Sequence, residues 1–362
     1  MITSRQSIPS GWPDTQVSGV FGSGVSEDKA DPYGTTQPSP IPNPTDSPGG
    51  EPVPDPGLPP EYPSYLKPIP INTRDIEQEM RGYLNSEEPG LMRVLYSTWN
   101  AERDAIKYQE IRNAIRDGEF SDGFLAKFQQ DYNEMINEEL APRWNDAMKA
   151  SAENVAGYVE SEFGVFPRFQ QGTQRIREWV QTRGGELAVN LSRQQHQALR
   201  NILTYHITEN PAPPRELARL IRGSIGLTSK QAAYVSNFRE QLQEAGELTA
   251  SQIEHRVQNY IGRLHRLRAE RIARTELAWG YHQGMFEQMR QAQEGPLSGH
   301  EIVKRWWTAG DERVCSHCGP LHRQVVGMEQ TFPGATPRVP NTYTPPAHPS
   351  CRCGLIYEVL SQ

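Results

Sequence analysis

RWWTAGDERVCSHCGPLHRQ, the stretch from Arg305 to Gln324, contains the first two cysteines of this 362-residue chain. Only two more follow, in PPAHPSCRCGLIYEV from Pro345 to Val359. Apolar and polar residues alternate around these motifs, as in short strands, in the segments HEIVKRWWTA, VVGMEQTF and RCGLIYEVL. Sequence rich in turn residues and proline separates these segments. A unit this short buries little apolar core, so a cross-link is needed to stabilise it. The sequence therefore predicts a small β-containing module over residues 300–358, closed by its cysteines.

The spacing of the cysteines favours a metal site. Cys315 and Cys318 are two residues apart, so both thiolates can reach one ion. Cys351 and Cys353 would point to the same face if they lay on a strand, because strand side chains alternate. Four thiolates suit the tetrahedral preference of Zn²⁺, and we expect a structural Zn²⁺ here. A disulfide or simple reduced thiols are the alternatives.

Three histidines lie near these cysteines. His348 precedes Cys351 by three positions, so it is the first substitute for one of the thiolates, or a residue that supports a ligand through a hydrogen bond. His317 and His322 are expected at the surface. The four cysteines remain the favoured ligand set.

Composition limits the class of protein. The formal charge is −7, the mean hydropathy is −0.70 and hydrophobic residues make up 36%, which is low for a chain that is compact throughout. No basic region followed by an apolar run opens the sequence, and no stretch approaches the roughly 18 to 20 apolar residues that cross a bilayer. We therefore expect a protein kept in a reducing cytosol, where grouped thiols bind metal more often than they form disulfides.

The first 73 residues form a proline-rich tract. Sixteen of the 30 prolines lie before residue 71, so neither helix nor central strand is expected there. One interpretation is a disordered leader or spacer. The other is an extended arm that binds along a partner, with Tyr62, Tyr65, Leu66 and Ile69 as anchors.

Helical patterns fill residues 74–210, which we expect to form a helical domain. Thr73 is the expected N-cap of its first helix. Apolar residues then recur at helical spacing in a predicted helix over 91–115, in a second run from residue 124, and from about 172 to 208. The first two runs place these residues in the core: Leu91, Leu95, Trp99, Ile106 and Ile111, then Phe124, Phe128, Tyr132 and Ile136. The proline-rich TENPAPPRE predicts a domain boundary near 210.

Two more helices are expected between residues 228 and 293, the second some forty residues long. Its expected apolar stripe contains Val257, Ile261, Leu264, Leu267 and Ile272. Arginines surround the stripe between residues 256 and 274: Arg256, Arg263, Arg266, Arg268, Arg271 and Arg274. They form either a solvated face or a surface for an acidic protein or for DNA, contacted without sequence specificity. The architecture expected overall is mainly α, with an extended proline-rich arm, a helical middle and a small C-terminal β-containing module that binds zinc.

The cysteine motifs resemble those of the phage Mu F-like head-morphogenesis, or minor head, proteins. The shared pattern is W-x3-D-x-R-x-C-x2-C followed by P-P-x-H-P-x-C-R-C. It falls here on Trp307, Asp311, Arg313, Cys315, Cys318, Pro345, Pro346, His348, Pro349, Cys351, Arg352 and Cys353. RIARTELAWGYHQG resembles the family's R-T-E helix, at Arg274, Thr275 and Glu276, and IGLTSKQAA resembles its entry helix. His322 departs from the family, which often has glycine there. The resemblance covers roughly residues 224–358, within an expected family domain over 211–362.

The resemblance implies a virion protein, made in the host cytoplasm, that lies at the portal vertex or inside the capsid. Its implied partners are the portal, major capsid or scaffolding protein, and its implied role is head assembly or DNA packaging. A membrane partner is not expected. The alternative classes are a metal-dependent enzyme that processes nucleic acid and a carrier domain for an effector. The sequence has no H-E-x-x-H, no P-loop and no deaminase motif, so no enzymatic activity is expected.

Overall fold

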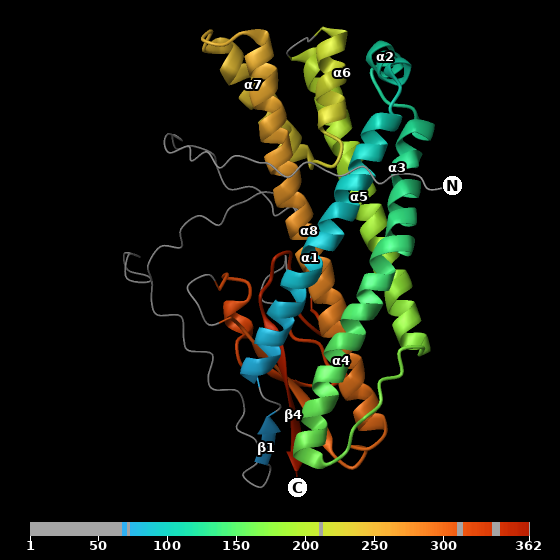
Figure 1. Cartoon of the computed structure of the whole chain (residues 1–362), viewed down its shortest axis with the longest axis vertical. Helices are drawn as coiled ribbons and strands as arrows, with labels where there is room; N and C mark the ends of the chain where they lie inside the picture. The colour runs from blue at the N-terminus through green and yellow to red at the C-terminus, as the bar shows by residue number, and fades with distance from the viewer. Residues whose placement is uncertain (1–66, 71–72, 210–212, 310–313, 335–340, 362) are drawn as a thin grey trace, which may run out of the picture. The chain divides into compact units, whose positions relative to one another are not determined.

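The computed structural model describes residues 67–70, 73–209, 213–309, 314–334 and 341–361, and it is mainly helical (Figure 1). The helices are α1 (Thr73–Ala105), α2 (Tyr108–Asp117), α3 (Asp122–Met135), α4 (Ala141–Phe163), α5 (Gln174–Thr208), α6 (Pro214–Gly223), α7 (Ser229–Glu244) and α8 (Ala250–Glu294), with a π-helical turn, η1 (Ile136–Leu140), joining α3 to α4. The strands are β1 (Lys67–Pro70), β2 (Glu301–Trp307), β3 (Val325–Gly327) and β4 (Gly354–Ser361), and a 3₁₀ turn, η2 (Gly319–Leu321), follows β2. The mainly α class expected from the sequence is confirmed.

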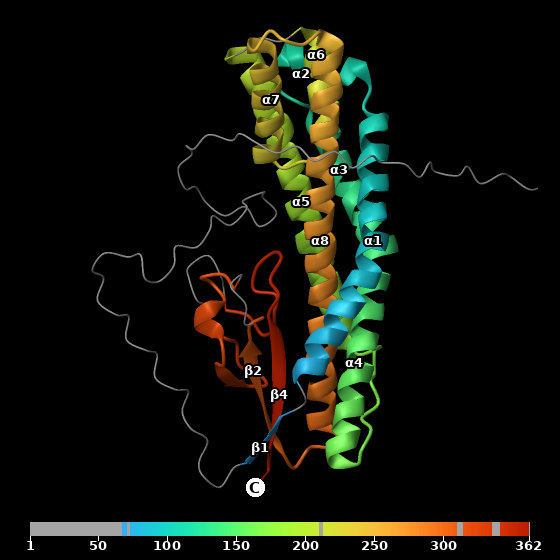
Figure 2. The ribbon, with the colours of Figure 1, turned by 60° about the vertical axis from the view of Figure 1, so that its left-hand side comes forward.

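Helix α8 is the long helix expected after residue 249, and it spans 45 residues. Its N-cap is Thr249, whose side chain accepts a hydrogen bond from the backbone N–H of Gln252. Helices α1 and α4 pack along it (Figure 2). Glycine makes the contact with α4 close: a Cβ placed on Gly284 would lie 2.3 Å from the carbonyl oxygen of Met148. The absence of a side chain at Gly284 therefore sets the distance between these two helices.

The apolar stripes predicted in the helical middle are buried. Leu91, Leu95 and Trp99 are at most 2% exposed, and the aromatic stripe from residue 124 is likewise buried. The predicted bounds of the helix over 91–115 are wrong at both ends. Helix α1 already begins at Thr73 and ends at Ala105, and α2 begins at Tyr108. Lys107 between them is extended, and its N–H donates to the carboxylate of Glu110, which caps α2. A local capping interaction thus separates two helices within a stretch whose apolar residues keep helical spacing throughout.

Two residues of α8 were assigned to the wrong face. Leu267 was expected in the apolar stripe but is 41% exposed, whereas Arg268 was expected on the basic face and is 1% exposed. The Arg268 guanidinium donates to Gln194 Oε1 at 2.8 Å and lies 5.8 Å from the Trp99 ring. A buried acceptor on α5 and an aromatic ring on α1 together accommodate this arginine.

The strands form one antiparallel sheet in the order β1-β4-β2-β3. The three expected C-terminal strands are confirmed, and β1 comes from the end of the proline-rich tract. Its Ile69 pairs with Val359 of β4. Prolines at 68 and 70 are compatible with this place because an edge strand needs fewer backbone donors. The named anchors Tyr62, Tyr65 and Leu66 lie outside the described residues.

The break expected near residue 210 falls between α5, which ends at Thr208, and α6, which begins at Pro214. The division into a domain over 74–210 and one over 211–362 stays a prediction. Among the described helices, none combines the length and the apolar character needed to cross a membrane.

Candidate metal centre

Two tight turns present the side chains that could hold a metal ion. In the first, the N–H groups of Cys318 and Gly319 both donate to the carbonyl oxygen of Cys315, at 3.1 and 3.0 Å. In the second, the N–H of Cys351 donates to the carbonyl oxygen of His348 at 3.1 Å. Each turn folds its motif back on itself, so side chains three positions apart point into the same space.

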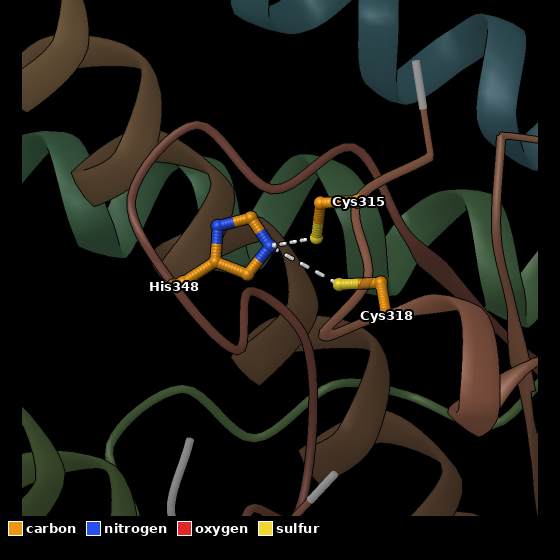
Figure 3. Close-up of side chains that lie close together, drawn as sticks. All are labelled: Cys315, Cys318 and His348. Atoms are coloured by element: carbon orange, nitrogen blue, oxygen red, sulfur yellow. Dashed lines mark hydrogen bonds between the residues drawn. The ribbon is translucent and has the colours of Figure 1, made fainter. Parts of the chain in front are cut away.

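The two turns face each other (Figure 3). His348 Nε2 lies 3.1 Å from the Sγ atom of Cys315 and 3.1 Å from that of Cys318. Cys318 Sγ lies 3.8 Å from Cys351 Sγ. Donor atoms within 4.8 Å of one another form two groups, Cys315–Cys318–His348 and Cys318–Cys351–Cys353. Cys318 belongs to both groups, so it is the centre of the five-residue cluster.

Parts of the cluster have the spacing of a zinc site, and its donor atoms fall into two groups that share Cys318. Two thiolates on a tetrahedral ion, each about 2.3 Å from it, are about 3.8 Å apart, which matches the Cys318–Cys351 distance. His348 Nδ1 is 2.9 Å from the carbonyl oxygen of Pro349, to which it can only donate. The Nε2 lone pair therefore points at the cysteines. The nitrogen–sulfur distances would need to lengthen by about half an ångström to reach tetrahedral values.

Electrostatics within the cluster favours the thiolate at Cys315 and Cys351 and the thiol at Cys318 and Cys353. A hydrogen bond from Cys318 lowers the pKa of Cys315 to about 4, against the effect of burial. The pKa of Cys351 is also lowered, first by its hydrogen bond with Cys318, whereas that of Cys318 is raised. Burial alone would lower the pKa of His348, but the Cys315 hydrogen bond and the nearby thiolates raise it to about 9. A metal ion binding here would displace the protons on Cys318 and His348.

The expected geometry of the second motif is wrong. Cys351 and Cys353 do not lie on a strand, because β4 begins at Gly354. They approach Cys318 from the turn that precedes the strand, and Ser350 in this turn has a positive φ of 60°. His348 Nε2 lies 3.1 Å from the Sγ atoms of both Cys315 and Cys318, within reach of an ion that they would share. The structure thus brings together all five residues named from the sequence, in a cluster that could hold a metal ion.

The R-T-E segment of α8 connects this cluster to the helices. Thr275 Oγ1 accepts a hydrogen bond from the N–H of Ser350 at 3.0 Å. Glu276 is fully buried and its Oε2 accepts from Arg183 Nε of α5 at 3.0 Å. Arg274 donates to Glu88 of α1 at 3.1 Å. Three consecutive residues thus join α8 to the cysteine turn, to α5 and to α1.

Sequence reasoning missed His282, which makes a second link to the cluster. Its Nε2 donates to the carbonyl oxygen of Cys353 at 3.1 Å, and its ring is 1% exposed. Burial lowers its pKa to about 4, so the ring is neutral at pH 7. No local pattern distinguishes His282 from the apolar residues around it, because its partner lies 71 positions away.

Of the remaining residues named from the motifs, His317 lies next to the cluster, and Trp307 contacts His322. Trp307 ends β2, with its ring 4.8 Å from that of His322. His322 Nδ1 accepts a hydrogen bond from the N–H of Thr308 at 3.2 Å. The rings of His317 and His348 are 6.2 Å apart. Both of the histidines expected at the surface are half-buried, as is Arg352.

Asp311 and Arg313 lie outside the described residues. The functional roles named for the individual site residues stay predictions.

Comparison with known proteins gives one match. Residues 215–356 match the family model described as Phage Mu protein F like protein. The match begins at α6, covers α7, α8, β2 and β3, and ends within β4, so it includes all five residues of the cluster. A search of the curated proteins and one of the solved structures found no match to this chain. Residues 215–356 of the chain are therefore similar to the phage Mu protein F like proteins.

Proposed function

We propose that this chain is a minor head protein of a tailed phage that binds the portal or the inner capsid wall and assists head assembly or DNA packaging. The family match over residues 215–356 supports a phage head-morphogenesis protein, with a place in the virion and contacts to other head proteins. The observation that carries the proposal is the overlap between the family match and the cysteine cluster. Both cysteine turns, and the α8 segment that anchors the second of them, lie within the matched residues.

The ion we propose for the cluster is Zn²⁺, held by Cys315, Cys318, His348 and Cys351. The distances from His348 to Cys315 and Cys318 and from Cys318 to Cys351 support the set, and the proton fixed on His348 Nδ1 leaves Nε2 available. Binding one ion would draw Cys351 into the group of Cys315, Cys318 and His348. Cys353 is the substitute ligand, next to Cys318 and Cys351. Four protein ligands leave no open position for water, which suits a structural rather than a catalytic ion.

Docking to the head is proposed to lie outside the metal module. The candidate contacts are the arm residues Tyr62, Tyr65 and Leu66, with the portal, major capsid or scaffolding protein as partner. Ile69 is the weakest of the proposed anchors, because its backbone pairs with β4 of the same chain. An arm that becomes ordered on binding can cover a large surface with a short stretch of chain.

Co-purification with assembled heads tests the function. The full chain should be recovered with procapsids in the presence of portal protein, and imaging should locate it at the portal or the inner wall. A chain lacking residues 1–66 keeps β1 and should retain its metal and helicity but be incorporated less. Normal incorporation would place docking in the helices. Absence of the full chain from heads, together with metal-dependent cleavage of nucleic acid by the pure protein, would favour the enzymatic alternative.

A further inference from the structure

A groove of about 350 Å³ lies between α5 and α3, on a part of the molecule that the family match does not cover. Polar side chains predominate in its lining, and none of them is acidic. The lining residues are Gln129, Val189, Ser192, Arg193, His196, Gln197, Arg200 and Asn201. The groove is therefore rich in hydrogen-bond donors and positively charged.

Two arginines set its charge. Arg193 and Arg200 are exposed and seven residues apart on α5, which places them on the same side of the helix about two turns from each other. Arg193 Nη2 donates to Asn190 Oδ1 of its own helix at 2.8 Å. Arg200 makes no hydrogen bond or ion pair with any residue in the described part of the chain. Its guanidinium is available to an anion from outside.

The groups between and beside the arginines are held in place by the protein. His196 Nε2 donates to the carbonyl oxygen of Leu125 on α3 at 2.7 Å, and burial together with the charge of Arg200 lowers the pKa of this histidine. Asn201 Nδ2 donates to Ser229 Oγ at 2.6 Å. Ser229 begins α7, and the start of a helix carries a partial positive charge. Thus the Asn201 end of the groove also favours an anion.

We propose that this groove binds phosphate groups of a DNA backbone. Arginine pairs with phosphate through two parallel N–H bonds, and side-chain amides donate to the same oxygens. No aromatic side chain lines the groove, so the groove has no ring on which a base could stack. The proposal rests on the proposed function insofar as packaged DNA is the polyanion that a protein inside a phage head meets. Binding would be independent of sequence, with the groove positioning the chain on DNA.

A salt titration of binding tests this directly. The full chain is titrated against a fluorescein-labelled 30-base-pair duplex, and anisotropy gives the affinity at several salt concentrations. Each phosphate contact contributes about 0.9 to the slope of log affinity against log salt. The double variant Arg193→Gln/Arg200→Gln should therefore lower the slope by about 1.8. Its circular dichroism and thermal midpoint should match those of the unchanged chain.

The pair Arg215→Gln/Arg219→Gln is the matched control. These arginines are also exposed and lie four residues apart on α6, but they do not line the groove. This variant should change the slope much less than the α5 pair does. An equal fall for both pairs would show that binding follows exposed charge in general and would overturn the proposal. No change with the α5 pair would overturn it as well.

Competition identifies the ligand chemistry. Inorganic phosphate should shift the NMR signals of the His196 ring in the unchanged chain and not in the α5 double variant. Unlabelled duplex should compete far better than free phosphate if the groove binds several phosphates along a DNA strand. Stronger competition by polyglutamate than by DNA would point to an acidic protein instead and sink the proposal. These assays use pure protein and measure only the groove. A negative result would overturn the DNA-binding proposal without contradicting the head-assembly proposal, and a positive result would not prove head assembly.

Discussion

The helical region from α1 to α8 and the C-terminal segment from β2 to β4 achieve a fixed structure in different ways. In the helical region, large apolar side chains such as Leu91, Trp99 and Trp144 are almost completely buried between helices. The C-terminal segment has a smaller core, to which Trp306, Phe332 and Tyr357 contribute. It adds a cluster of five side chains that could hold a metal ion, and hydrogen bonds between its loops and α8.

The difference shows which interactions each region can lose. Helix packing distributes its stability over many side chains, so removal of one polar group should have a limited effect. The turns that present the cysteines lie outside the strands, and their shape depends on a few specific contacts. We therefore expect the C-terminal segment to depend on its metal, and the helical region to depend on the closeness of its helices.

The largest effect is expected for loss of the metal. Cys318 belongs to both donor groups, so Cys318→Ser should abolish metal binding and disorder the cysteine turns. Binding of a structural zinc contributes on the order of 10 kcal/mol to a small unit. Elemental analysis of protein purified without added metal should find close to one Zn²⁺ in the unchanged chain and none in the variant. The helical circular dichroism should remain nearly unchanged.

Cys353→Ser is the matched variant, because Cys353 belongs to only one donor group. With His348 as the fourth ligand, this variant should keep its zinc, whereas His348→Ala should bind it more weakly. The reverse result would assign the fourth position to Cys353. Retention of a full equivalent of zinc by Cys318→Ser would contradict the proposed centre.

The next effect concerns the helical region alone. Gly284→Ala would place a methyl group 2.3 Å from the Met148 carbonyl oxygen, so α4 and α8 would have to separate. Overpacking of this kind costs about 3 kcal/mol or more. Gly262→Ala is the control on the same helix, with nothing within 4 Å of the added carbon. It should stabilise the helix by about 0.5–1 kcal/mol. Chemical unfolding measures both, and similar free energies of unfolding for the two variants would refute the close approach.

The same contrast explains how far the sequence could predict the structure. Periodicity located α5 and α8, and motif spacing located all five residues of the cluster that could hold a metal ion, because both signals are local. The burial of Arg268 depends on Gln194, 74 positions away, and the pairing of β1 depends on β4 at the other end of the described chain. The position of Cys351 and Cys353 before β4 follows from turn geometry that strand alternation does not reveal. Contacts between distant segments leave no local pattern, so these features required the structure.

The smallest effect probes the link between the two regions. Thr275→Val keeps the shape of the side chain but removes the oxygen that accepts the Ser350 N–H. The loss of one hydrogen bond costs about 1 kcal/mol, since the exposed Ser350 can turn to water. If the bond holds the cysteine turn closed, a chelator should remove the zinc about fivefold faster, in line with tenfold per 1.4 kcal/mol.

Thr98→Val is the control for this link, because the Thr98 hydroxyl donates only to Val94 of its own helix, at 3.1 Å. This change should leave the zinc release rate as it is in the unchanged chain. The two rates are compared by following transfer of zinc to a coloured chelator at fixed pH. Equal release rates in the two variants would mean that the cysteine turns hold their shape without α8, and that the two regions are joined by packing alone. A faster rate only in Thr275→Val would show that α8, a helix of the matched family segment, directly stabilises the metal centre.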